Sequence, residues 1–150
     1  MTPSPATPRP KAVDVAFWLL VGAAILLVVN GLMASTLNFD AARSVADNSV
    51  SDDKLQSYLT FQRAIGIFSI VIGAVLGLLA GKTRKGDPRF RRATIAFAVT
   101  VTVLVVGIAV LVKIIHLLAL IAVLPMIFGA LALTRPPVAA WFNEQDPARG

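Results

Sequence analysis

Residues 93–112 read ATIAFAVTVTVLVVGIAVLV, without one charged side chain. A helix needs about 20 such residues to cross a bilayer core about 30 Å thick. Three more stretches free of Asp, Glu, Lys and Arg occupy much of the remaining chain, at residues 15–39, 64–81 and 114–134. Helices of water-soluble proteins present a polar face to solvent, so these segments indicate a polytopic membrane protein. We predict an all-α fold, a bundle of four antiparallel transmembrane helices.

The composition supports a membrane protein with little chain outside the bilayer. Hydrophobic residues make up 57% of the 150 residues and charged residues 15%, with a mean hydropathy of +0.78. The largest segment between apolar stretches, about residues 35–60, is too short for a core of its own. We therefore expect one transmembrane domain, residues 13–134, with tails on either side. The predicted boundaries are a disordered tail at residues 1–12, spans at about 13–34, 61–81, 93–112 and 116–134, and a tail at 135–150.

Proline and aromatic residues support these boundaries. The proline-rich residues 1–10 disfavour regular structure. Phe17 and Trp18 lie where aromatic rings anchor a helix at headgroup depth. Trp141 and Phe142 follow the last span, and we expect them to rest on the membrane surface.

The connections between spans are less regular. The loop at residues 35–60 is expected to contain a short surface helix capped by Ser51 or Asp52. The last two spans are separated only by residues 113–116, a tight hairpin without turn-forming residues. Pro125 inside the last span removes one backbone hydrogen bond and is expected to kink the helix.

The basic residues set the predicted orientation. Six of the fourteen Lys and Arg residues lie in residues 82–92: Lys82, Arg84, Lys85, Arg89, Arg91 and Arg92. Such clusters mark the cytoplasmic side of a membrane protein. We therefore predict a plasma-membrane protein with both termini in the cytoplasm. A rival reading has three spans, with the chain beyond Lys113 re-entrant and the C-terminal tail outside. The cluster is also a candidate contact for anionic headgroups or an acidic partner, rather than for nucleic acid.

The residues that catalysis and metal binding require are scarce. The chain has no cysteine and one histidine, which excludes thiolate chemistry and multi-histidine metal sites. It lacks the GxSxG, HExxH and P-loop motifs, and no acidic residue lies in the middle of a span. Lys113 and His116 are interpreted as marking the water interface, with anion binding or pH sensing as the alternative. We predict a non-enzymatic protein with no cofactor and no small-molecule substrate.

Small residues in the second span form the sharpest local pattern. Ser69, Gly73, Gly77 and Gly81 recur every four residues, and Gly66 extends their face by one turn. Such a strip lets another helix approach closely. That helix belongs either to the same chain or to a partner protein or second copy. Separately, Asn30 in the first span is expected to hydrogen-bond a neighbouring helix, as intramembrane Asn usually does.

Both ends of the chain resemble a known kind of protein. The opening residues 11–18, KAVDVAFW, follow a proline-rich tail, and the ending includes residues 135–142, RPPVAAWF. Together they resemble small four-helix membrane proteins of actinobacterial type, rich in Ala and Val and lacking Cys. The resemblance implies a plasma-membrane location in a bacterium with high-GC coding. It transfers no functional residues.

These observations favour one function and leave others open. The leading hypothesis is a non-enzymatic accessory or scaffold subunit that acts through helix–helix packing, with the lipid bilayer and a membrane-protein partner or a second copy as its contacts. The alternative is a small homo-oligomeric transporter or channel, with the pore between copies because four spans are few for a solute path. An enzyme acting on lipid is a weaker third reading.

Overall fold

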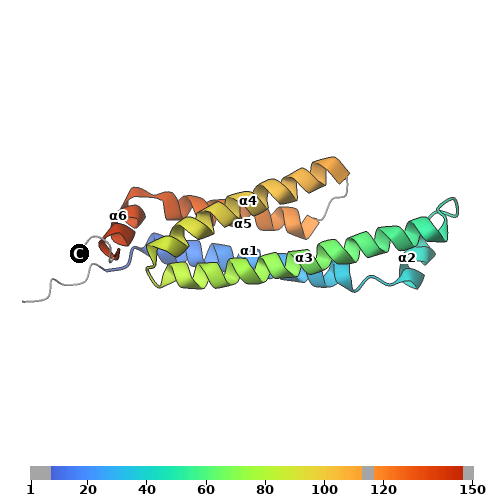
Figure 1. Cartoon of the computed structure of the whole chain (residues 1–150), viewed down its shortest axis with the longest axis horizontal. Helices are drawn as coiled ribbons and strands as arrows, with labels where there is room; N and C mark the ends of the chain where they lie inside the picture. Colours follow the sequence, from blue (N-terminus) through green and yellow to red (C-terminus); the bar gives the residue numbers. More distant parts are fainter. Residues whose placement is uncertain (1–7, 113–116, 147–150) are drawn as a thin grey trace, which may run out of the picture.

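A computed structural model describes residues 8–112 and 117–146. The helices are α1 (Lys11–Ser35), α2 (Phe39–Val45), α3 (Asp52–Arg84), α4 (Pro88–Val112), α5 (Leu117–Thr134) and α6 (Pro136–Glu144). Four of them, α1, α3, α4 and α5, are long and apolar enough to cross a membrane. They run along one axis in alternating directions, with α2 at one end and α6 at the other (Figure 1). The predicted all-α bundle of four transmembrane helices is confirmed.

Helix α3 begins well before the predicted span. We expected the second span to begin at about residue 61, but α3 starts at Asp52, and its 33 residues measure about 50 Å. Hydropathy marks only the part of a helix that fits an apolar bilayer, whereas this helix continues through polar residues beyond it. Extended Ser51 precedes α3, and Asp52 and Asp53 in its first turn suit the positive end of the helix dipole. Residues 52–60 of the expected loop are therefore helix.

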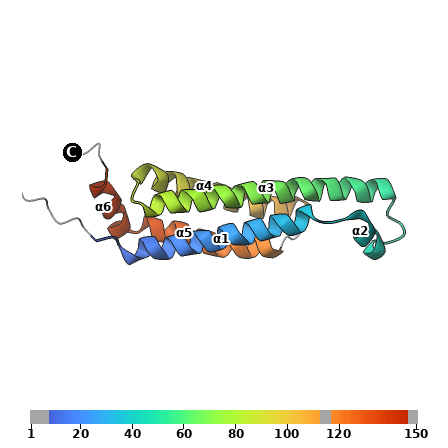
Figure 2. The same cartoon turned by 90° about the horizontal axis from the view of Figure 1, so that it is seen from below.

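The remaining loop contains a short helix, as predicted, but the predicted cap Ser51 occupies the N-cap position of α3 instead. Asn38 is the capping residue of α2, and its Oδ1 accepts a hydrogen bond from the Ala41 N–H at 2.7 Å. Arg63 of α3 donates to the Leu37 carbonyl oxygen from Nε at 3.3 Å and from an Nη at 2.9 Å. These bonds hold the α1–α2 connection against α3, which lies beside α1 along much of the bundle (Figure 2).

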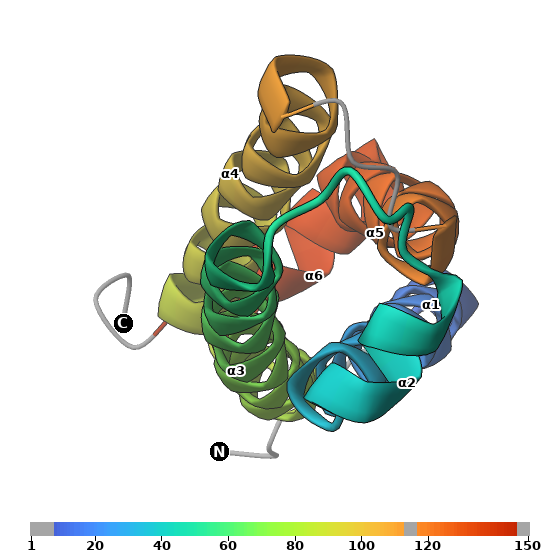
Figure 3. The ribbon, with the colours of Figure 1, turned by 90° about the vertical axis from the view of Figure 1, so that its right-hand side faces the viewer.

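The four long helices are buried by their neighbours to different extents. Helix α1 packs chiefly on α3 and α5, while α4 packs on α3 and α5 (Figure 3). Only 17% of the residues in the most apolar stretch of α4 are buried, against 44% in α5. Most of α4 therefore faces the surrounding lipid. Helix α5 runs through Pro125 without ending there, and the hairpin at residues 113–116 lies outside the described residues.

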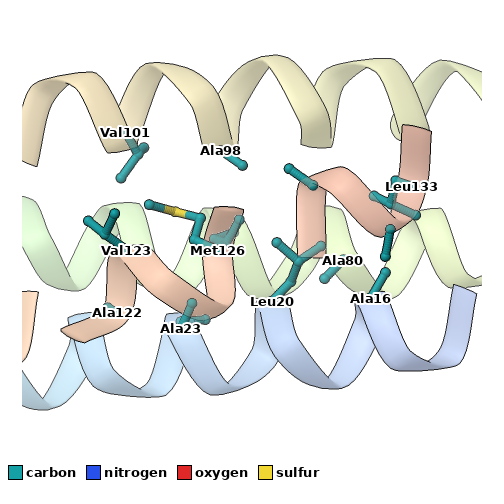
Figure 4. Close-up of a cluster of buried hydrophobic side chains, with 14 of the residues drawn as sticks. Ala16, Leu20, Ala23, Ala80, Ala98, Val101, Ala122, Val123, Met126 and Leu133 are labelled. Carbon is teal, nitrogen blue, oxygen red and sulfur yellow. The ribbon is translucent and has the colours of Figure 1, made fainter. Parts of the chain in front are cut away.

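Small side chains dominate the core. Met126 of α5 is fully buried, among residues of α4 and α1 (Figure 4). Ala16, Leu20 and Ala23 supply the α1 side, with Ala16 and Ala23 entirely covered. On the α5 side Gly129 lets Leu20 approach closely, since a Cβ there would lie 2.8 Å from Leu20 Cγ. Alanine and glycine at these contacts let the backbones come together, as is usual between membrane helices.

The chain after the last span is not a surface tail. Residues 136–144 form α6, and Val138, Trp141 and Phe142 are buried on one face of it. Their spacing of three and four residues is that of an amphipathic helix. Trp141 also contacts Gly86, where a Cβ would lie 3.0 Å from Trp141 Cη2. The expectation that Trp141 and Phe142 rest on the membrane surface is therefore wrong, because α6 turns these rings onto the bundle.

Candidate functional site

The first half of the predicted small-residue strip is closed by α1 of the same chain. Ser69 is buried, and its hydroxyl donates to the Leu27 carbonyl oxygen at 2.8 Å. A Cβ on Gly73 would lie 2.7 Å from the Ala24 carbonyl oxygen and 2.8 Å from Val28 Cγ2. A real Cβ essentially never comes this close to another heavy atom, so the contact requires glycine.

Gly66 extends this contact toward the α2 end, as its position in the sequence predicted. A Cβ on Gly66 would lie 2.7 Å from the Gly31 carbonyl oxygen and 2.8 Å from the Ser35 nitrogen. Gly31 was missed by sequence analysis, because α1 has no run of small residues at four-residue spacing. The available signal was the shared face of Ala24, Gly31 and Ala34, spaced by seven and three residues.

The second half of the strip is open. Gly77 meets only the Ala24 Cβ, at an ordinary contact distance of 3.9 Å, and a Cβ on Gly81 would meet nothing within 4 Å. Ala74, three residues before Gly77, is exposed. We call Ala74, Gly77 and Gly81 the open strip. These residues share one helix face by their spacing, and α1 approaches that face of α3 only loosely, through Ala24 at Gly77.

The predicted basic loop is mostly helical. Helix α3 continues to Arg84 and α4 begins at Pro88, so the connection is only three residues long. Gly86 within it has φ +94°, a left-handed conformation that glycine adopts without strain. Hydropathy placed the limits of this connection too far apart, because charged residues occupy the ends of both helices.

Two of the six basic residues are engaged within the chain. Arg84 Nε lies 2.9 Å from Asp14 Oδ1, and its guanidinium stacks 4.5 Å from the Phe17 ring centre. Arg91 Nε donates to the Leu133 carbonyl oxygen at 2.9 Å, which satisfies a backbone group near the end of α5. Arg84 therefore joins α3 to α1, and Arg91 joins α4 to α5.

The other four, Lys82, Lys85, Arg89 and Arg92, are exposed. Within the described residues, their side chains make no hydrogen bond or ion pair, although the Lys82 ammonium lies 5.9 Å from the Phe90 ring centre. We call these four residues the free basic group. Its charge is available to a surface or partner beside the α6 end of the bundle.

Buried polar side chains in the spans differ in how they are satisfied. The hydroxyls of Thr83 and Thr94 are 2.7 Å apart and join α3 to α4. Asn30 is only 7% exposed, and within the described residues its side chain makes no hydrogen bond. The expected bond from Asn30 to a neighbouring helix is therefore not found in this part of the chain. The described residues also contain no cluster of three or more His, Asp or Glu able to hold a metal ion.

Comparison with protein-family models, with curated proteins and with solved structures finds no match for this chain. The class of the protein therefore rests on its own sequence and structure. Four long apolar helices, packed through small residues, define a multi-pass membrane protein.

Proposed function

We propose that the protein is a non-enzymatic accessory or scaffold subunit of the plasma membrane, with both termini cytoplasmic. It binds a transmembrane helix of another membrane protein through the open strip on α3. The observation that carries this proposal is the contrast between Gly73, where a Cβ would clash with α1, and half-buried Gly81, where a Cβ would meet nothing within 4 Å.

The chemistry of the strip supports a helix as its ligand. Lipid tails are as apolar as leucine, so helices in a membrane associate through close van der Waals contact instead of hydrophobic burial. The first half of the strip binds α1 in this way, with backbones in contact at Gly66 and Gly73. The second half offers the same absence of side chains at Gly77 and Gly81, and among the described residues only the Ala24 Cβ comes within 4 Å of a Cβ at either position.

The free basic group adds an electrostatic contribution at the same end of α3. Basic residues beside an anionic leaflet contribute about 1 kcal/mol each. Lys82 and Lys85 lie within a few residues of Gly81. This charge orients the α6 end toward the cytoplasm and attracts anionic headgroups or an acidic segment of the partner.

Purification from the native membrane in mild detergent, followed by mass spectrometry, tests the proposal. Three variants carry the same change: Gly81→Leu in the open strip, Gly107→Leu in open space on α4, and Gly73→Leu under α1. We expect the wild type and Gly107→Leu to retain a different membrane protein at fixed stoichiometry. Gly81→Leu should accumulate normally but lose this protein, whereas Gly73→Leu should reduce the amount of folded chain.

Other outcomes contradict the proposal. Retention of the partner by Gly81→Leu would show that the open strip is not the interface. A wild-type complex made of this chain alone would favour the homo-oligomeric transporter or channel, and liposome flux assays would then follow. A wild-type monomer would exclude a stable scaffold role.

A further inference from the structure

A cavity lies inside the bundle, in the half nearer α2. Its volume is 60 Å³, and residues of α1, α3, α4 and α5 line it. One water molecule needs roughly 10–15 Å³ of such a cavity. The cavity is therefore large enough to hold part of an extended, chain-shaped ligand. Its lining is apolar apart from Asn30 and Ser69, and the Ser69 proton is already donated to Leu27.

The mouth of the cavity opens to lipid. Phe68 of α3 and Leu104 of α4 both line the cavity, and they are 56% and 43% exposed. Helix α4 diverges from α3 toward the α2 end of the bundle (Figure 1). Because the two exposed lining residues come from α3 and α4, the cavity opens between these helices, and a molecule can reach it from the lipid.

Asn30 supplies the polar group of this cavity. It is more than nine-tenths buried and makes no side-chain hydrogen bond within the described residues, and its amide is not fully enclosed by protein as the unpaired Gln62 Oε1 is. An amide left unpaired in apolar surroundings is unfavourable. Asn30 precedes the end of α1 at Ser35 by five residues, or about 7.5 Å along the axis. It therefore lies near the shallow end of the cavity, with Ile72 and Leu104 deeper.

This arrangement fits the upper part of a membrane glycerolipid. Its ester carbonyl oxygen lies just below the headgroups and accepts a hydrogen bond, and its acyl chain continues toward the bilayer centre. A single water at Asn30 and Ser69 would occupy only part of the cavity, and the rest of the lining is apolar and offers further waters no polar partner. We propose that the cavity binds one acyl chain of a glycerolipid in the leaflet at the α2 end, with the Asn30 amide donating to its ester carbonyl.

Native mass spectrometry of the delipidated full chain, titrated with phosphatidylglycerol, tests this site. Ala109 lines the cavity, whereas Ala96 is exposed on the same helix outside its lining. We expect the wild type and Ala96→Phe to bind one lipid molecule more tightly than any further lipid molecules. Ala109→Phe should lose this tight binding. Asn30→Leu should weaken it about three- to tenfold, the equivalent of one neutral hydrogen bond.

An ether-linked phosphatidylglycerol, which lacks the ester carbonyl, separates the hydrogen bond from general lipid binding. The wild type should bind the ether lipid as weakly as Asn30→Leu binds the ester, and Asn30→Leu should not distinguish the two. Equal binding of ester and ether lipid by the wild type would overturn the proposal. So would unchanged binding by folded Ala109→Phe, or displacement of the bound lipid by an isoprenoid quinone. Partner binding is a separate readout, so this site and the proposed interface can fail independently.

Discussion

Replacing Gly73 by alanine should weaken the α1–α3 contact. The new Cβ would lie 2.7 Å from the Ala24 carbonyl oxygen, whereas ordinary contacts begin at 3.4 Å. Relief requires a shift of about 0.7 Å, the difference between these distances. The obstacle is backbone, which cannot rotate away as a side chain can, so α1 as a whole must move. Overpacking of this kind costs about 1–3 kcal/mol.

Gly81→Ala is the matched control for this prediction. Both variants gain up to about 1 kcal/mol from the better helix propensity of alanine, but only Gly73→Ala introduces a clash. The difference between their free energies of unfolding therefore isolates the steric cost, and we expect Gly73→Ala to be less stable by about 1–3 kcal/mol.

Reversible unfolding in mixed detergent micelles, followed by tryptophan fluorescence, measures both free energies. Similar stability of Gly73→Ala and Gly81→Ala would refute the close packing of α1 on α3. Destabilisation by Gly81→Ala alone would show that the tight helix contact lies at Gly81 instead of Gly73.

Three further predictions follow from other contacts. Phe142→Ala removes a fully buried ring, which costs about 3–5 kcal/mol in a core. Helix α6 should then undock. In a background whose other tryptophan is replaced by phenylalanine, the emission of Trp141 should shift to the red. Unshifted emission would contradict the packing of α6. Thr83→Val leaves the buried Thr94 hydroxyl without its partner, at a cost of about 1–3 kcal/mol; the double valine variant should recover part of this loss, and simple additivity would argue against the pair. A hydrogen bond from the Ser49 N–H lowers the pKa of Asp47 below its ordinary 3.8; the turn is therefore fully stabilised above that ordinary value and loosens as pH falls through the lowered pKa. NMR titration of Asp47 should give a midpoint below 3.8. A midpoint at or above 3.8 would show that this hydrogen bond does not form in solution.

The sequence predicted what the bilayer imposes. The spans follow from the length and continuity of apolar residues, because a membrane helix must satisfy its own backbone within an apolar solvent. The limits of α3 could not be found this way, since residues 52–60 are mostly polar yet helical. Hydropathy reports where lipid ends, which is not where a helix ends.

Contacts between helices were only partly predictable. The spacing of Ser69 and Gly73 indicated a packing face, but whether that face met α1 or another protein depended on Gly31 and Ala24, which complete the contact from a distant part of the chain. The burial of Trp141 was missed for a related reason. An amphipathic helix of nine residues has the same pattern whether its apolar face meets lipid or protein.

The arrangement of the chain across the membrane is the central claim, and the absence of cysteine makes it directly measurable. Single cysteines at Ser49, Arg89 and Asn143 report the α2 end, the α3–α4 connection and α6. In intact cells, a membrane-impermeant maleimide should label Ser49→Cys, and should label Arg89→Cys and Asn143→Cys only after lysis. Labelling of Arg89→Cys in intact cells would reverse the orientation, and opposite behaviour of Arg89→Cys and Asn143→Cys would contradict the four-span topology.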